Sequence, residues 1–90
     1  MIAAKFLTLT TSTDGTEFTT FDDVACRTVN VWNLTGQSLT FKYANDAGEF
    51  VLPNGLAYAF NGINNAKQLL VKRTDESDTP ATLSSVEVEL

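Results

Sequence analysis

Apolar and polar side chains alternate with a period of two on both sides of a glycine in residues 29–43, VNVWNLTGQSLTFKY. This period places successive side chains on opposite faces of an extended strand. We therefore predict a β-hairpin whose loop is residues 34–36, with Gly36 in the left-handed conformation. In this register Val31 opposes Leu39 and Val29 opposes Phe41, on one apolar face. The other face then carries Thr28, Asn30, Trp32, Ser38, Thr40 and Lys42.

Residues 50–60, FVLPNGLAYAF, repeat this construction. Pro53, Asn54 and Gly55 suit the successive positions of a tight turn, with Gly55 at the left-handed site. The segment predicts a second hairpin. Its apolar face holds Leu52 opposite Leu56 and Phe50 opposite Tyr58, with Phe60 further along. Its other face holds Val51, Ala57 and Ala59.

Four further segments have the composition of strands: residues 2–10, 16–21, 69–74 and 82–90. In residues 82–90 one face is apolar, with Val86, Val88 and Leu90. Residues 2–10 are apolar on both sides, because Ile2, Ala4 and Phe6 alternate with Ala3, Leu7 and Leu9. Such a strand predicts either a central place in a sheet or a partner chain that covers one side. Residues 62–66, GINNA, predict a turn or a single helical turn.

Short strands separated by turn residues, with no helical period, predict an all-β fold. We expect a small antiparallel β-sandwich or barrel of about 7–8 short strands. A chain of 90 residues is long enough for one domain, which we place at residues 1–90. Its residues are 43% hydrophobic and 19% charged, which is typical of a globular protein.

The charge and the missing residue types exclude several function classes. A net charge of −5 with six Lys and Arg argues against binding to nucleic acid or to an anionic membrane surface. The chain has no His, which removes the usual zinc sites and the Ser-His and Cys-His nucleophiles. The single cysteine, Cys26, is expected to be a small buried side chain. We therefore expect no enzyme, no catalytic residue, no metal and no cofactor.

The amino-terminal residues lack the charged and apolar regions of a signal peptide, and no apolar run is long enough to span a membrane. We expect the protein to be made in a reducing cytoplasm and kept there or assembled into something larger.

Three acidic or amide motifs are candidate sites with simpler interpretations. Residues 75–78 contain three acids but do not have the spacing of a calcium loop, which favours a solvated loop. Asp22 and Asp23 are adjacent and point apart in an extended chain, which argues against a catalytic carboxylate pair. Asn33 begins an Asn-Leu-Thr glycosylation pattern, which carries little weight without a secretion signal.

Trp32 is the side chain with the most open interpretation, because the predicted register places it on the polar face. Either a second sheet or the amino-terminal strand covers it, or it contacts a partner, where Trp is enriched among the residues that dominate binding. A sugar-stacking platform is a third possibility, for which only Tyr43 or Tyr58 could supply a second ring.

The segments VNVWNLTG-x-SLTFKY, EFVLPNG-x-AYAFNGI and QLLVKR, within residues 29–73, make the chain resemble virion proteins of tailed bacteriophages. It is most similar to the small capsid decoration, or cement, proteins of the head lattice. The resemblance implies a β-sandwich or barrel, often a trimer, that binds the major capsid protein or other virion subunits and bridges them to strengthen the shell. The expected location is the virion, assembled in the host cytoplasm. We hypothesise that Ile2, Phe6 and Trp32 contribute to such contacts.

Two other functions remain open at this point. A carbohydrate- or receptor-binding module of the tail-fibre type would need an exposed aromatic platform with polar neighbours. A small protein inhibitor would need one high-affinity protein target.

Overall fold

The computed structural model describes residues 4–90, which contain eight strands and one short 3₁₀ helix joined by loops. They follow in the order β1 (Ala4–Thr10), β2 (Thr19–Thr20), β3 (Thr28–Trp32), β4 (Leu39–Tyr43), β5 (Phe50–Leu52), β6 (Ala57–Asn61), η1 (Ala66–Gln68), β7 (Leu69–Arg73) and β8 (Thr82–Glu89).

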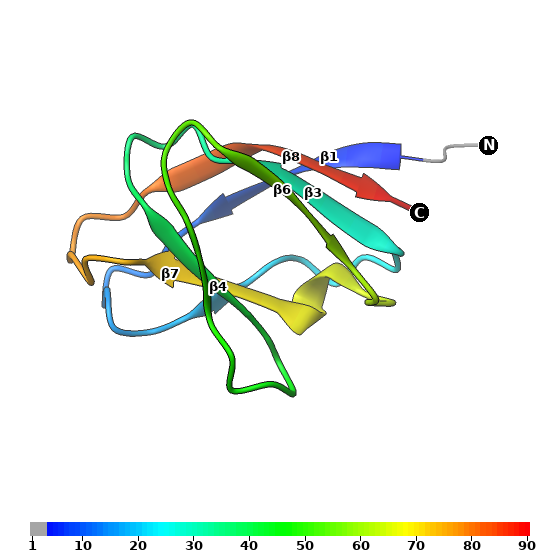
Figure 1. The fold of residues 1–90 in the computed structure, drawn as a ribbon, viewed down its shortest axis with the longest axis horizontal. Coiled ribbons are helices and arrows are strands. Elements are labelled where there is room, and N and C mark those ends of the chain that lie inside the picture. The colour runs from blue at the N-terminus through cyan, green and yellow to red at the C-terminus, as the bar shows by residue number, and fades with distance from the viewer. Residues whose placement is uncertain (1–3) are drawn as a thin grey trace.

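The strands form two antiparallel sheets of four, in the orders β1-β8-β3-β6 and β2-β7-β4-β5. Figure 1 shows the sheets as two layers, with β8, β1, β6 and β3 in one and β7 and β4 in the other. This confirms the predicted all-β fold and selects the sandwich, because the sheets do not join into a closed barrel.

The pairing is that of one long antiparallel ribbon wound on itself. β1 pairs with β8, β2 with β7, β3 with β6 and β4 with β5. Two further pairings, of β3 with β8 and of β4 with β7, join these pairs into the two sheets. Eight strands arranged in this way form a jelly roll. Among the described strands, only β4 and β5 are both consecutive and hydrogen-bonded.

The first predicted hairpin is wrong in its pairing. β3 and β4 belong to different sheets, so residues 33–38 form an arch that crosses the sandwich. The predicted faces are nevertheless correct for the apolar positions, since Val29, Val31, Leu39 and Phe41 are all buried. A hairpin and an arch both turn the same alternating side chains inward, and only the hydrogen-bonded neighbours distinguish them. Gly36 has the predicted positive φ of 87°.

The second predicted hairpin is wrong for the same reason, because β5 and β6 also lie in different sheets. Leu52 and Phe60 are buried as expected, and Gly55 has the predicted positive φ of 89°. Leu56 is exposed, which contradicts its predicted place on the apolar face. Phe50 and Tyr58 are not ladder partners, but their rings pack against each other across the open edge of the sandwich, with centroids 4.5 Å apart and planes tilted by 39°.

The two terminal strands pair with each other. Leu7 and Leu9 of β1 are buried, as are Val86 and Val88 of β8, whereas Leu90 is exposed. A central place for the amino-terminal strand is wrong, because β1 is the edge strand of its sheet. Its second apolar side is open, so a covering partner chain stays a prediction.

One hydrophobic core fills the space between the sheets, with Phe41, Leu39 and Leu69 among its largest buried side chains. The radius of gyration is 12.1 Å, which is close to the roughly 12 Å expected of a compact chain of this length. The predicted turn at residues 62–66 leads into η1, where Asn65 caps the helix and Gln68 completes a capping box.

Candidate functional site

The outer side of the sheet β1-β8-β3-β6 carries the most prominent exposed aromatic residues outside the sandwich edge. The register aligns Phe6, Glu87, Asn30 and Ala59 in one row across its four strands. Trp32 pairs with Ala57 two residues further along. We call this surface the aromatic face. It consists of Phe6, Asn30, Trp32, Ala57, Ala59, Ser85 and Glu87.

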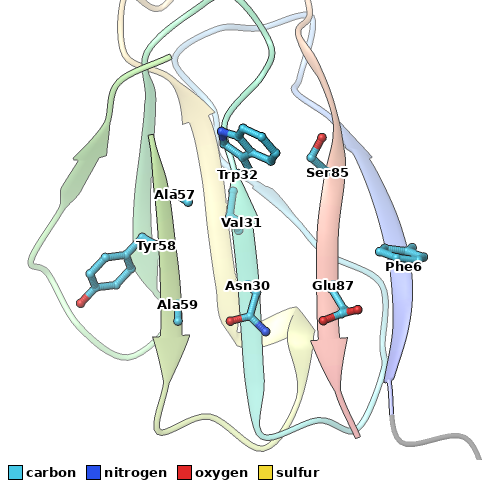
Figure 2. Close-up of a pocket in the computed structure, with 9 residues that line it drawn as sticks. All are labelled: Phe6, Asn30, Val31, Trp32, Ala57, Tyr58, Ala59, Ser85 and Glu87. Atoms are coloured by element: carbon cyan, nitrogen blue, oxygen red, sulfur yellow. The ribbon is translucent and has the colours of Figure 1, made fainter. Parts of the chain in front are cut away.

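Small side chains make the aromatic face hollow. The short side chains of Ala57, Ala59 and Ser85 do not fill the space around Trp32. An open depression of about 490 Å³ lies over them. Figure 2 shows the ring of Trp32 directed toward Ser85, with Ala57 and Ala59 on the other side of β3 and Phe6 on the far side of Glu87. A depression of this volume is within the range of small-ligand sites, but it is open rather than enclosed.

The two rings that flank the depression are exposed to different degrees. Phe6 is 76% exposed and Trp32 is 53% exposed. The indole Nε1 of Trp32 donates a hydrogen bond of 3.3 Å to the carbonyl oxygen of Gly55, which ties the ring to the arch between β5 and β6. Trp32 is therefore held in place and solvent-facing at the same time.

The polar groups of the aromatic face give it a negative character. Asn30 Nδ2 donates to a carboxylate oxygen of Glu89 at 3.4 Å. Within residues 4–90, no Lys or Arg forms an ion pair with Glu87, and no side chain donates a hydrogen bond to it. Its carboxylate lies between Phe6 on one neighbouring strand and Asn30 on the other.

Two of the three predicted contact residues come together on this surface. Phe6 and Trp32 belong to the same face of the same sheet, although 26 positions separate them in the sequence. Ile2, the third, lies outside the described residues. The alternative in which a second sheet or the amino-terminal strand covers Trp32 is wrong, since half of its surface is exposed.

Sequence reasoning did not assign Asn30, Glu87 and the alanines to a site. Alternation already placed Glu87 and Ala57 away from the apolar faces. Their proximity to Phe6 depends on the order β1-β8-β3-β6, which brings together strands distant in the chain. Neither predicted second ring of a sugar platform stands beside Trp32, although Tyr58 lines the edge of the depression. Tyr58 points away from Trp32 in Figure 2, and Tyr43 hydroxyl donates to the carbonyl of Asn61.

The acidic loop at residues 75–78 is organised by basic side chains. Arg73, which is buried, donates two hydrogen bonds of 2.9 and 2.7 Å to the carboxylate of Asp75 and a third to the carbonyl of Thr79. This pairing holds the pKa of Asp75 below its ordinary value. Glu76 pairs with Lys72 at 2.9 Å. Across the described residues, no group of three His, Cys, Asp or Glu side chains is placed to hold a metal ion.

Asp23 also has a structural role. Its carboxylate accepts a hydrogen bond of 2.6 Å from Asn65 Nδ2 and lies 3.6 Å from Lys67 Nζ, so it supports the cap of η1. Cys26 is buried, as predicted, and burial raises the pKa of its thiol.

Asn33 is fully buried. Its amide nitrogen donates to the carbonyls of Gln37 and Leu52, and its oxygen accepts from the backbone and the hydroxyl of Thr35. The side chain of Asn33 thus makes all four hydrogen bonds available to an amide. In the folded chain, the asparagine of the glycosylation pattern connects the two arches by hydrogen bonds.

Comparisons with protein families, with curated proteins and with solved structures find no match to this chain. No helix among residues 4–90 has the length and apolarity needed to cross a membrane.

Proposed function

We propose that this protein is a structural subunit of a tailed-bacteriophage virion, a capsid decoration protein that docks on the head shell through its aromatic face and bridges capsid subunits. The observation that carries the proposal is the exposure of Phe6 and Trp32 on one face of one sheet. Large aromatic side chains are costly to leave in water, and Trp is a frequent anchor of protein interfaces.

The architecture is compatible with this use. Jelly rolls serve in viral capsid and lectin domains, although one fold supports many functions. The resemblance of residues 29–73 to decoration proteins adds a second, independent reason. In this proposal the chain acts as a homo-oligomer, with a trimer as the expected state.

The size of the surface favours a repeated rather than a single contact. Four strands spaced by about 4.8 Å, each about six residues long at about 3.3 Å per residue, present a projected area on the order of 400 Å². A stable interface commonly buries about 800 Å² per partner. A lattice compensates for weak single contacts, because neighbouring contacts raise the effective concentration of one another.

The first test is whether the chain accompanies purified virions by mass spectrometry. The second is re-addition of purified protein to particles that lack it, with Phe6→Ala and Trp32→Ala as variants. We expect both to lose binding while their urea midpoints stay near wild type, since neither ring is in the core. Val51→Ala, an exposed apolar residue on β5 of the other sheet, is the matched control and should bind.

The opposite results would contradict the proposal. Full particle binding by both aromatic variants would remove the aromatic face as the docking surface. A loss of about 3–5 kcal/mol of stability in Trp32→Ala would make that residue core rather than interface. Light scattering that gives a single 9.8 kDa chain at working concentrations would contradict the trimer.

One observation favours a second candidate, a carbohydrate-binding module. Glu87 lies on the strand between the two rings and Asn30 lies beside it on the strand of Trp32, and amide and carboxylate groups near aromatic rings are suited to sugar hydroxyls. Glycan-array binding that Trp32→Ala abolishes would support it.

A further inference from the structure

We propose that the aromatic face receives an arginine side chain from the protein on which it docks, with Glu87 as its counter-charge and the rings of Phe6 and Trp32 on either side. This inference rests on the proposed docking function and names the chemistry of the partner.

Glu87 is the reason to expect a cation. Its carboxylate is exposed, lies between Phe6 and Asn30, and pairs with no Lys or Arg of the described chain. An apolar partner surface laid over the face would remove water from this charge without replacing it, which is unfavourable. A partner that brings a cation meets the carboxylate instead.

The aromatic neighbours select the kind of cation. Cations are attracted to the face of Trp or Phe within about 6 Å of the ring centre. Arginine combines this with a planar fork that can donate two hydrogen bonds to one carboxylate. Ser85, two residues from Glu87 on β8, is small and leaves room between the strands of the two rings for the methylene groups of such a side chain.

The spacing of the rings argues against one sugar held between them. Phe6 and Trp32 stand on β1 and β3, with β8 between them, so they are about 10 Å apart across the sheet. They are also offset along the strands by about two residues, or roughly 7 Å. A side chain that enters above Glu87 can contact both rings, whereas a single pyranose cannot stack on both.

A second copy of the chain is a poorer occupant. Two copies joined by this face about a two-fold axis would bring Glu87 and Glu89 of each against the same acidic surface. Most basic side chains of the chain are also engaged elsewhere. Lys67, Lys72 and Arg73 form ion pairs, and Lys42 lies 4.9 Å from the ring centre of Phe18.

The test is a titration of the full-length protein with Nα-acetyl-arginine amide, followed through the indole N–H signal of Trp32 in ¹⁵N spectra at constant ionic strength. We expect a saturable shift. The arginine probe on Glu87→Gln should bind about two- to fivefold more weakly, and the neutral analogue Nα-acetyl-citrulline amide, which also lacks the cation, should bind more weakly still. Glu49→Gln, which removes an exposed carboxylate from the β4–β5 loop, should bind like wild type.

Equal binding of the arginine and citrulline probes, or a Trp32 shift with methyl glucoside and none with arginine, would overturn the inference. Particle binding separates it from the docking function. If Phe6→Ala and Trp32→Ala lose particle binding and Glu87→Gln retains it, the arginine inference is wrong and docking stands. If all three variants bind particles normally, docking does not use the aromatic face and the arginine inference falls with it. If the wild-type protein does not bind particles, the docking function itself fails.

Discussion

The side chain of Asn33 connects two arches that lie far apart in the sequence. It joins the β3–β4 arch to the carbonyl of Leu52 at the end of β5, and its backbone contacts the second arch through Gly55 and Leu56. The same three residues, Asn-Leu-Thr at 33–35, are compatible with a glycosylation site and with a buried structural amide. The difference is burial, which only the packing of the two arches produces.

We expect Asn33→Ala to lower the free energy of unfolding by about 3 kcal/mol, because it leaves buried carbonyls without donors. Urea unfolding followed by far-ultraviolet circular dichroism measures this loss. Asn45→Ala, in the exposed β4–β5 loop, is the control and should change stability by less than about 0.5 kcal/mol. Similar midpoints for the two variants would show that the Asn33 network adds little.

Trp32 is a second residue whose interpretation depended on what lay above it. Its alternation with Val31 and its place outside the core followed from the strand period, and both are correct. Its exposure could not be predicted, since the same pattern would be found if another element covered the outer face of the sheet.

Among the loops, the β1–β2 connection is held closely against the β7–β8 loop. A β-carbon at Gly15 would overlap backbone atoms of Glu76 and Ser77, whereas one at Gly36 would meet nothing within 4 Å. The two glycines therefore serve different purposes. Gly15 permits contact between two loops, and Gly36 supplies a positive φ in the first arch.

We expect Gly15→Ala to cost about 3 kcal/mol, because backbone must move to admit the methyl group. Gly36→Ala should cost about 1 kcal/mol, which is the penalty of a left-handed conformation without any clash. Chemical unfolding of the two variants in parallel makes the comparison. The packing argument fails if Gly36→Ala proves the more damaging change.

For the molecule as a whole, acid should reveal how much its carboxylates contribute. The pKa values of Asp14 and Asp75 lie below their ordinary value of 3.8, because Thr16 donates to Asp14 and Arg73 donates to Asp75. A carboxyl whose pKa is depressed on folding stabilises the protein above the unfolded pKa. This contribution is lost as the pH falls through the folded pKa.

We therefore expect the urea midpoint to fall as the pH drops below about 4. Asp75→Asn should have a lower midpoint at pH 7 and a smaller further loss in acid. Asp78→Asn serves as the control, since the Asp78 side chain, in the same loop, forms no ion pair with the described residues. An unchanged acid transition in Asp75→Asn would show that the Arg73–Asp75 pair is not linked to folding.

The sequence by itself determined the all-β class, the approximate positions of the strands and the inward positions of Val29, Val31, Leu39 and Phe41, although Leu56, Phe50 and Tyr58, predicted on an apolar face, are exposed. These depend on a two-residue period and on turn residues such as Gly36 and Gly55, which act over a few residues. They do not depend on which strands become neighbours.

Only the tertiary structure decided the pairing and therefore the candidate site. Hydrogen-bonded neighbours such as β1 and β8 are separated by most of the chain, and no local pattern specifies one distant partner over another. Both predicted hairpins failed for this reason, because an arch buries the same side chains as a hairpin. Phe6, Glu87 and Trp32 likewise share one surface only because β8 lies between β1 and β3.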